Sequence, residues 1–324
     1  MTDDTVITYV PFYRRRGPLI GIGVVLGVLL LLLIDIVALS LRLTSRSVAF
    51  PQLDDGIETW VIAGSDNRSS LPTGATAAQF GSTTDVPGAR ADIVIVITKR
   101  GNSVAVTSVP RDLTVLVKGY PQRLTFTLQK GPQGLIDALC TSLNIPADHF
   151  VQVEFSGFVD IINKLGGITV TIANPIRDTW TGLSIAKTGA VRLDGTQALA
   201  LVRSRQAQLL VDGKWIPETD GADARATWGA KVMLSLIEKA KSRARNPVEL
   251  QSLLWTLTGA ITTDSGTGLF DLAGLRSVAG QMTELPYGAT SVTGPPTQAH
   301  PVEITDATKK AVTKLGYDRR CSAS

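Results

Sequence analysis

The chain has few of the side chains that enzymes use most often as nucleophiles or zinc ligands. Its 324 residues include only two Cys and two His, which excludes clustered zinc sites and argues against a histidine-activated nucleophile. We expect His149 to be structural, and His300 lies in a Pro-rich segment. Cys140 and Cys321 could pair in an oxidising compartment, but their spacing alone does not decide whether they do.

Aromatic residues and unbalanced charge are also scarce. Aromatics make up 6% of the chain, and the basic sequence pI of 9.1 comes largely from the N-terminus. Residues 1–50 hold five Arg against three Asp, and the remainder holds 27 basic and 25 acidic residues. No basic stripe with interleaved aromatics occurs, so we expect no nucleic-acid partner. The 44% hydrophobic content is enough for a full core.

One apolar run is long enough to cross a membrane. Leu19 to Leu41 is interrupted only by Asp35 and Ser40, and such a helix spans a bilayer of roughly 30 Å. The run exceeds the roughly 7–15 residues of a signal-peptide core. Basic residues 14–16 precede it, which predicts a cytoplasmic N-terminus. We therefore expect a single-pass cell-membrane protein with a cytoplasmic segment 1–18, a transmembrane helix 19–41, a linker 42–56 and an extracytoplasmic domain 57–324.

Strand-like and helix-like patterns alternate in the extracytoplasmic part. The sequence predicts strands at 59–63, 89–97, 104–112, 150–155 and 168–172, and helices at 132–144, 156–165, 224–243, 247–257 and 269–282. Ser156 is expected to cap its helix, and Gly166-Gly167 to end it. Residues 173–192 have no regular pattern, and residues 195–202 form a short apolar segment. This alternation indicates an α/β sandwich, with C-terminal helices within 246–285.

Charged residues flank the predicted hairpin of the second and third strands. Arg90 and Asp92 enter the first strand, and Arg111 and Asp112 leave the second. Entry and exit of a hairpin lie at the same end of a sheet. Guanidinium groups suit phosphate oxygens, and carboxylates suit a hard cation such as Mg²⁺. The pattern predicts a diphosphate site, and the alternative is a surface salt-bridge cluster.

After the single N-terminal span, a series of short motifs covers about residues 59–242. The motifs are Gly64-Ser65-Asp66-Asn67-Arg68, Arg90-Ala91-Asp92, Pro110-Arg111-Asp112, Phe155-Ser156-Gly157-Phe158, Leu165-Gly166-Gly167-Ile168, and residues 193–200 running into Arg203-Ser204-Arg205. Their order resembles the LytR-CpsA-Psr family of cell-wall glycopolymer transferases.

The resemblance implies an α/β/α sandwich with a mixed central sheet that holds a polyprenyl lipid. It also implies a Gram-positive cell-wall enzyme that moves a glycopolymer from a polyprenyl diphosphate onto peptidoglycan, with Mg²⁺ or Mn²⁺ as cofactor. The implied catalytic residues are Arg90, Asp92 and Arg111, and the metal ligands are Asp66 and Asp92. The implied diphosphate-binding residues are Arg68, Arg123, Arg203, Arg205 and Arg225.

Two further expectations concern the phosphate groups and the lipid chain of the substrate. If their segment is extended, Arg203 and Arg205 point the same way and form a two-pronged phosphate clamp. Apolar residues on the predicted helices could line a lipid slot, and the alternative is ordinary core. The residues expected to line it are Ile136, Leu139, Phe158, Ile162 and Val202.

Three positions depart from the pattern that the resemblance implies. Thr125 stands where an Asn is usual, and Trp228 and Gly229 stand where an Arg and a Gln are usual; Lys231, one turn on, is a candidate replacement. An alternative function is therefore a member that binds polyprenyl phosphates, or hydrolyses the lipid diphosphate, without efficient transfer.

Overall fold

The computed structural model describes residues 16–51, 56–66, 89–204, 206–218, 221–275, 278, 282–289, 301–317 and 321, without the side chains of 16–19 and 221–226. The chain divides into two compact units, Met1–Arg42 and Leu43–Ser324. The first unit contains helix α1 (Arg16–Arg42). Its segment Ile20–Arg42 has a mean hydropathy of 3.0 and is 6% buried. Length and composition therefore suit a membrane span.

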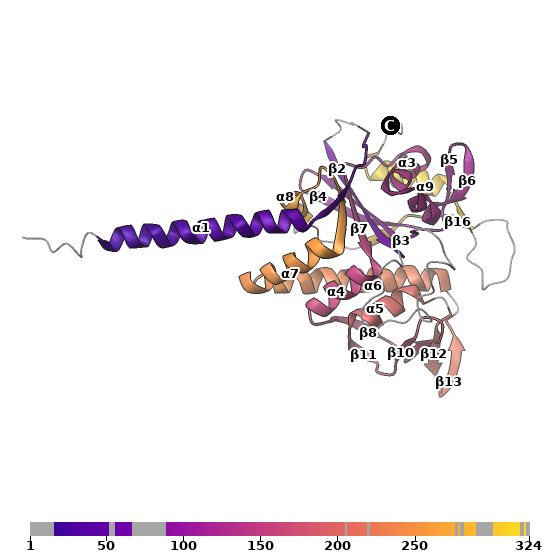
Figure 1. Ribbon diagram of the computed structural model, residues 1–324. Helices are drawn as coiled ribbons and strands as arrows, with labels where there is room; N and C mark the ends of the chain where they lie inside the picture. Colours follow the sequence, from indigo (N-terminus) through magenta and orange to yellow (C-terminus); the bar gives the residue numbers. More distant parts are fainter. Residues whose placement is uncertain are drawn as a thin grey trace, which may run out of the picture. The chain divides into compact units, whose positions relative to one another are not determined.

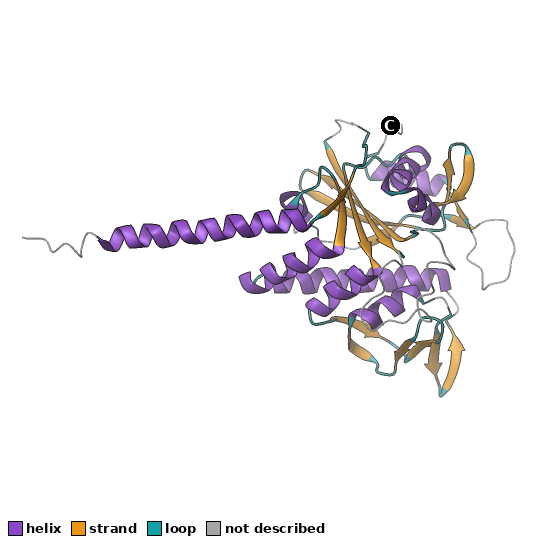
Figure 2. Cartoon of the chain, in the orientation of Figure 1, coloured by secondary structure: helices purple, strands orange, loops and turns teal. Residues whose placement is uncertain are grey.

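A mixed seven-stranded sheet forms the centre of the second unit (Figure 1, Figure 2). Its order is β1-β14-β7-β2-β3-β4-β15. The central strand β2 runs parallel to β7 and antiparallel to β3. The fold class predicted from the sequence is confirmed. The strands are β1 (Thr44–Arg46), β2 (Ile57–Ser65), β3 (Ala91–Arg100), β4 (Ser103–Val109), β7 (His149–Glu154), β14 (Ile261–Asp264) and β15 (Met282–Glu284).

Both faces of this sheet are covered because its strands are apolar on both sides. Val94 and Val96 pack into one core cluster, while Ile95 and Ile97 pack into another. The first cluster is completed by α3 (Pro132–Leu143), the 3-10 helix η2 (Leu124–Lys130) and α9 (Asp306–Lys314). The second includes residues of α6 (Gly221–Arg243) and α8 (Leu269–Gly274). The result is a layered sandwich.

A smaller layer of helices and short strands has its own core, which includes Ile162, Leu201 and Trp228. Its helices are α4 (Phe155–Lys164), α5 (Gly195–Arg203) and, packed on α4, α7 (Pro247–Ala260). Its strands form the pair β11-β8 and the sheet β10-β9-β12-β13. They are β8 (Ile168–Ile172), β9 (Ile176–Asp178), β10 (Leu183–Ile185), β11 (Gly189–Leu193), β12 (Gln208–Val211) and β13 (Lys214–Pro217).

Two further hairpin-like pairs and a disulfide complete the unit. Strands β5 (Thr114–Val117) and β6 (Tyr120–Arg123) pair antiparallel, as do β16 (Gly288–Ala289) and β17 (Val302–Glu303). Cys140 on α3 and Cys321 form a disulfide with their Cα atoms 5.2 Å apart. The pairing that the sequence left open is therefore present.

Several local predictions were wrong. The segment predicted to be irregular contains β9, β10 and β11, because strands this short give no clear periodicity. Helix α4 begins one residue before Ser156, and its N-cap residue is Glu154. Residues 195–202, for which no secondary structure was predicted, belong to helix α5, which Asp194 caps through the Gln197 N–H. Part of the expected linker is β1, which pairs with β14. The Gly-Gly stop is confirmed, since both glycines have positive φ.

Candidate functional site

The register of the central sheet gathers charged residues at one edge. Ser65 at the end of β2 lies opposite Ala91 of β3 and Glu154 of β7. Asp66, Arg90 and Phe155, each one residue beyond these positions, therefore lie at the same edge. Strand β4 ends there too, because Val109 pairs with Val94. The convergence predicted for the hairpin is confirmed.

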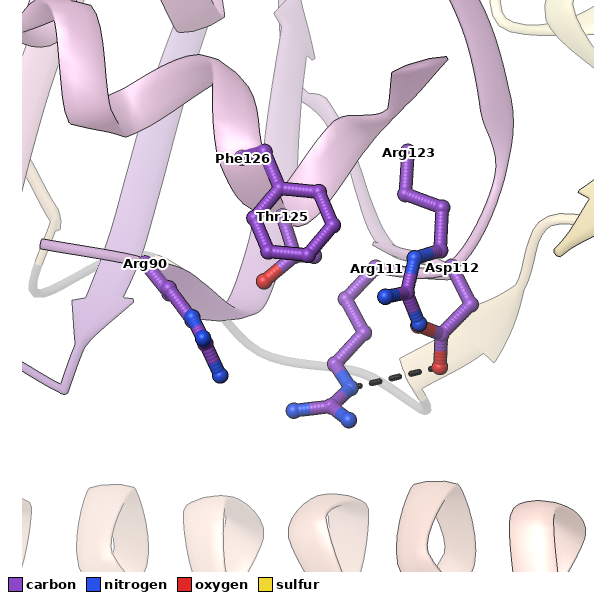
Figure 3. A pocket seen from close by; sticks show the side chains of 6 residues that line it. All are labelled: Arg90, Arg111, Asp112, Arg123, Thr125 and Phe126. Atoms are coloured by element: carbon purple, nitrogen blue, oxygen red, sulfur yellow. Dashed lines mark hydrogen bonds and ion pairs between the residues drawn. The ribbon is translucent and has the colours of Figure 1, made fainter. Parts of the chain in front are cut away.

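A pocket opens at this edge and has three arginines in its wall (Figure 3). The side chains of Arg90 and Arg111 extend toward the same space, and Arg123 lies beside Asp112 (Figure 3). Arg90 directly precedes β3, Arg111 lies two residues after β4, and Arg123 is the last residue of β6. The lining residues are Arg90, Arg111, Asp112, Arg123, Thr125 and Phe126.

Carboxylates and an aromatic ring hold these arginines in place. Arg111 pairs through Nη1 with Asp92 Oδ1 and donates from Nε to Asp112 Oδ2 at 3.3 Å. Arg123 Nη1 lies 3.2 Å from the other oxygen of Asp112. The guanidinium carbons of Arg123 and Arg90 lie 4.7 and 5.3 Å from the centre of the Phe126 ring. Fixed, partly desolvated guanidinium groups bind an anion more strongly than mobile surface charges do.

Asp66 is fixed by the main chain beside the pocket. Its Oδ1 accepts from the Arg90 N–H at 2.7 Å, and its own N–H donates to the Arg90 carbonyl at 3.1 Å. Asp66 is only 4% exposed. This reciprocal pair determines where the chain enters β3, and so where the Arg90 side chain starts.

Two buried polar atoms in the pocket wall have no partner among the described residues. They are Arg90 Nε and Thr125 Oγ1, and Thr125 is 3% exposed. Buried polar groups are normally satisfied. Their position in an arginine-lined pocket suits an oxygen-rich anion. Thr125 and Phe126 were not among the site residues predicted from the sequence, although both lie within three residues of Arg123.

Arg203 also lies at this edge, but not as part of an extended clamp. Arg203 is the last residue of α5, so the extended backbone expected around Arg203 and Arg205 is wrong for Arg203. Its guanidinium carbon lies 5.0 Å from the centre of the Phe155 ring. The next residue, Ser204, donates from Oγ to Asp178 Oδ2 at 2.6 Å. Arg68, Arg205 and the side chain of Arg225 lie outside the described residues.

The five residues expected to line one lipid slot are not brought together. Ile136 and Leu139 of α3 are fully buried in the core on one face of the central sheet. Ile162 is buried in the core of the smaller layer, against which Phe158 and Val202 pack. Helical spacing shows which side of a helix is apolar but not which face of the sheet it covers. Only Phe158, Ile162 and Val202 remain neighbours.

Asp66 and Asp92 suit a magnesium ion in number and chemistry. The described residues contain no group of three or more His, Cys, Asp or Glu that could hold a metal. Magnesium is commonly bound by one or two carboxylates, with water and substrate phosphate completing its shell. Asp92 uses Oδ1 for Arg111, and no hydrogen bond to its Oδ2 occurs among the described residues. The two carboxylates at this edge therefore fit a site that is completed by a phosphate ligand.

The chain belongs to the LytR_cpsA_psr family, whose profile matches residues 43–313. The solved structure of the LytR-Csp2A-Psr enzyme from Actinomyces oris has 35% identity and a TM-score of 0.73, covering 87% of this chain and 99% of that one. TagT bound to LI-WTA has the same fold, with a TM-score of 0.58 at 19% identity, covering 84% of this chain and 98% of that one.

Curated relatives carry cell-wall names. The polyisoprenyl-teichoic acid--peptidoglycan teichoic acid transferase TagT of Bacillus subtilis is 26% identical over 242 residues, which is 71% of each chain. The match to TagU of the same organism has 33% identity but covers only 36% of this chain and 39% of TagU. The match to the probable cell wall biosynthesis protein LcpB of Corynebacterium glutamicum covers 36% of its length.

Proposed function

We propose that this protein transfers a glycopolymer from a polyprenyl diphosphate carrier onto peptidoglycan outside the cell membrane. The observation that carries the proposal is the pocket with Arg90, Arg111 and Arg123 in its wall, at the sheet edge that also holds Asp66 and Asp92. The family membership and the transferase names of TagT and TagU support the choice of substrate class.

The reaction is a displacement at phosphorus. An acceptor hydroxyl of peptidoglycan forms a bond to the phosphorus that carries the glycopolymer, the bond from that phosphorus to the bridging oxygen breaks, and polyprenyl phosphate leaves. The negative charge of the diphosphate repels the attacking oxygen, so catalysis depends on charge neutralisation and alignment. The three arginines contribute both, because carboxylates and Phe126 fix their guanidinium groups.

A magnesium ion held by Asp66 and Asp92 would add charge neutralisation at the phosphate oxygens. Asp92 is also the better candidate to orient or deprotonate the acceptor hydroxyl. Its side chain is 21% exposed, whereas Asp66 is 4% exposed and accepts from the main chain of Arg90. A group that meets an incoming substrate must be reachable from solvent.

Besides the N-terminal arginines, two observations support a membrane-anchored protein whose second unit lies outside the cell. Helix α1 is long and apolar enough to anchor the chain. The bond between Cys140 and Cys321 is typical of proteins that fold in an oxidising compartment.

The test is incubation of the purified full-length chain with a polyprenyl diphosphate glycan, with and without peptidoglycan, at several Mg²⁺ concentrations. We expect glycan on peptidoglycan and release of polyprenyl phosphate only when acceptor is present. Arg111→Lys keeps the charge but loses the two-pronged contact with Asp92 and Asp112. It should lower the rate about tenfold or more, whereas Arg100→Lys, at the opposite end of β3, should leave it unchanged.

Equal lipid-phosphate release without peptidoglycan would support the hydrolase alternative instead. A rate independent of Mg²⁺ would contradict the metal assignment. Calorimetric titration tests the metal assignment separately from the reaction rate. Asp92→Ala and Asp66→Ala should each weaken Mg²⁺-dependent binding of the lipid diphosphate.

A further inference from the structure

The segment that joins α6 to α7 concentrates positive charge. Residues 239–248 hold four basic side chains, Lys239, Lys241, Arg243 and Arg245, and the acidic residues Glu238 and Glu249 flank them. The whole chain after residue 50 has 27 basic and 25 acidic residues. Arg243 pairs with Glu249, whereas Arg245 is exposed and has no ion-pair partner in the part of the chain that the structure describes. We call residues 239–248 the basic turn.

Large apolar side chains are exposed in and near the basic turn. Val248 in the first turn of α7 is 78% exposed, and Phe270 in α8 is 80% exposed. The opposite is true of Leu253 on the packed face of α7. It is only 5% exposed and packs against Ile161 of α4 and Leu165, the residue after α4. Exposed apolar residues beside clustered lysine and arginine are typical of surfaces that lie on anionic membranes.

The basic turn lies one helix away from the point at which the second unit begins. Strand β1 starts two residues after α1 ends, and its Thr44 pairs with Thr262 of β14. Strand β14 follows α7 without a break. Because α7 has 14 residues, its length is about 21 Å. Lys241 Nζ in the basic turn donates to the carbonyl of Val278, which follows α8, so the basic turn and α8 lie near each other.

We propose that the basic turn, together with Phe270, docks on the anionic headgroups of the lipid bilayer. The inference rests on the proposed anchoring of the chain by α1 and adds a second contact with the same membrane. A second contact with the membrane restricts the orientation of the second unit more than one covalent link does. The arginine pocket would then face the lipid carrier in a limited range of directions.

The experiment uses the full chain in lipid nanodiscs and measures amide hydrogen exchange across residues 239–250 and 269–274. We expect about fivefold or greater slowing in discs that contain phosphatidylglycerol, compared with discs of phosphatidylcholine alone. The slowing should weaken in high salt, because screening reduces attraction between charges at the surface.

Paired variants separate docking from general effects of charge. Arg245→Glu with Val248→Asp should abolish the slowing, since both side chains are exposed and neither contributes to a described core. Lys310→Glu with Ala307→Asp makes the same change in charge on α9, also at exposed positions, and should leave the slowing intact. All four changes lie outside the arginine pocket.

The outcomes are distinct. Equal exchange in both kinds of disc, or slowing that survives Arg245→Glu with Val248→Asp, would overturn the proposal. Slowing caused by soluble polyphosphate but not by phosphatidylglycerol would assign the surface to a phosphate polymer and would also overturn it. Failure of the chain to enter discs at all would instead contradict the anchoring by α1.

Discussion

One buried carboxylate links the smaller layer to the arginine-bearing end of α5. Asp178 is 1% exposed. Its Oδ2 accepts from Ser204 Oγ at 2.6 Å and from the Gln206 N–H at 3.2 Å, and its Oδ1 accepts from the Trp180 N–H at 2.9 Å. These bonds define the main chain directly after Arg203. We infer that Asp178 positions this segment without touching substrate.

Removing the hydroxyl that joins Ser204 to Asp178 should therefore affect binding more than folding. Ser204→Ala should lower the free energy of unfolding by about 1–2 kcal/mol, and it should weaken lipid-diphosphate affinity about tenfold because the arginine segment is no longer fixed. Calorimetric titration and urea unfolding measure the two effects.

Ser235→Ala is the matched control for this change. Ser235 Oγ donates to the Thr169 carbonyl at 2.7 Å, and it joins α6 to β8. Its loss should cost similar stability while lipid affinity stays at the wild-type value. Equal loss of affinity in both variants would show that Asp178 acts through overall stability alone.

Glu58 gives the stability of the sheet a dependence on pH. Burial by itself raises its pKa, but hydrogen bonds from Lys99 and Trp60 and the nearby positive charges outweigh burial and hold the pKa below 4.5. A carboxyl whose pKa is lower in the folded state stabilises the fold above its unfolded pKa. That contribution is lost as the pH falls through the folded value.

Glu58→Gln should therefore destabilise the protein at neutral pH and cost progressively less as the pH drops below about 4.5. Urea unfolding of wild type and variant between neutral pH and pH 3 measures the difference. A difference that is constant across this range would show that the ionised form of Glu58 contributes nothing.

At the scale of elements, two glycines in helices have opposite surroundings. A Cβ on Gly157 of α4 would lie 2.3 Å from the carbonyl oxygen of Ala260, at the end of α7. A Cβ on Gly229 of α6 would meet nothing within 4 Å. The first glycine permits two helices to approach closely, whereas the second is only a weak point in its helix.

Alanine should consequently have opposite effects at the two positions. Gly229→Ala should raise the free energy of unfolding by about 0.5–1 kcal/mol through helix propensity. Gly157→Ala should lower it by about 1–3 kcal/mol, since α4 and α7 must move apart. Thermal and urea unfolding compare them, and stabilisation by both would mean that α4 and α7 do not pack as described.

Trp228, one residue earlier, has a structural role that the sequence did not indicate. It is 8% exposed in the core of the smaller layer, and Nζ of Lys231 lies 4.4 Å from the centre of its ring. An arginine at this position would leave a hole in that core. Trp228, which departs from the family pattern, therefore serves packing in this core. That Lys231 replaces the missing arginine in catalysis stays a prediction.

The elements that could be predicted from sequence were those with long, clear periodicity. The hairpin of β3 and β4 and helices α3 and α6 have such patterns, and the hairpin alone was enough to bring Arg90 and Arg111 together. Asp178 and Phe126 could not be found this way. Their importance comes from contacts with Ser204 and Arg123, which depend on how separate elements pack.

At the scale of the whole second unit, the C-terminal segment closes the fold around its first strands. The Tyr317 hydroxyl lies 2.9 Å from Thr59 Oγ1 on β2 and 2.7 Å from Thr98 Oγ1 on β3. Val312 of α9 packs in the core beneath the same sheet. Asn144 accepts at Oδ1 from the Cys321 N–H and donates through Nδ2 to the Tyr317 carbonyl. The disulfide to Cys140 fastens this segment to α3.

Loss of the disulfide should weaken the whole unit, because the bond spans 181 residues and long loops gain most entropy when they are opened. Cys140→Ala with Cys321→Ala should lower the free energy of unfolding by about 2–5 kcal/mol. Hydrogen exchange should rise first in residues 306–317, whose hold on the sheet depends on Val312 and Tyr317. A thiol reductant should reproduce the effect in wild type and add nothing in the double variant. Unchanged exchange in residues 306–317 would show that packing alone holds the C-terminal segment.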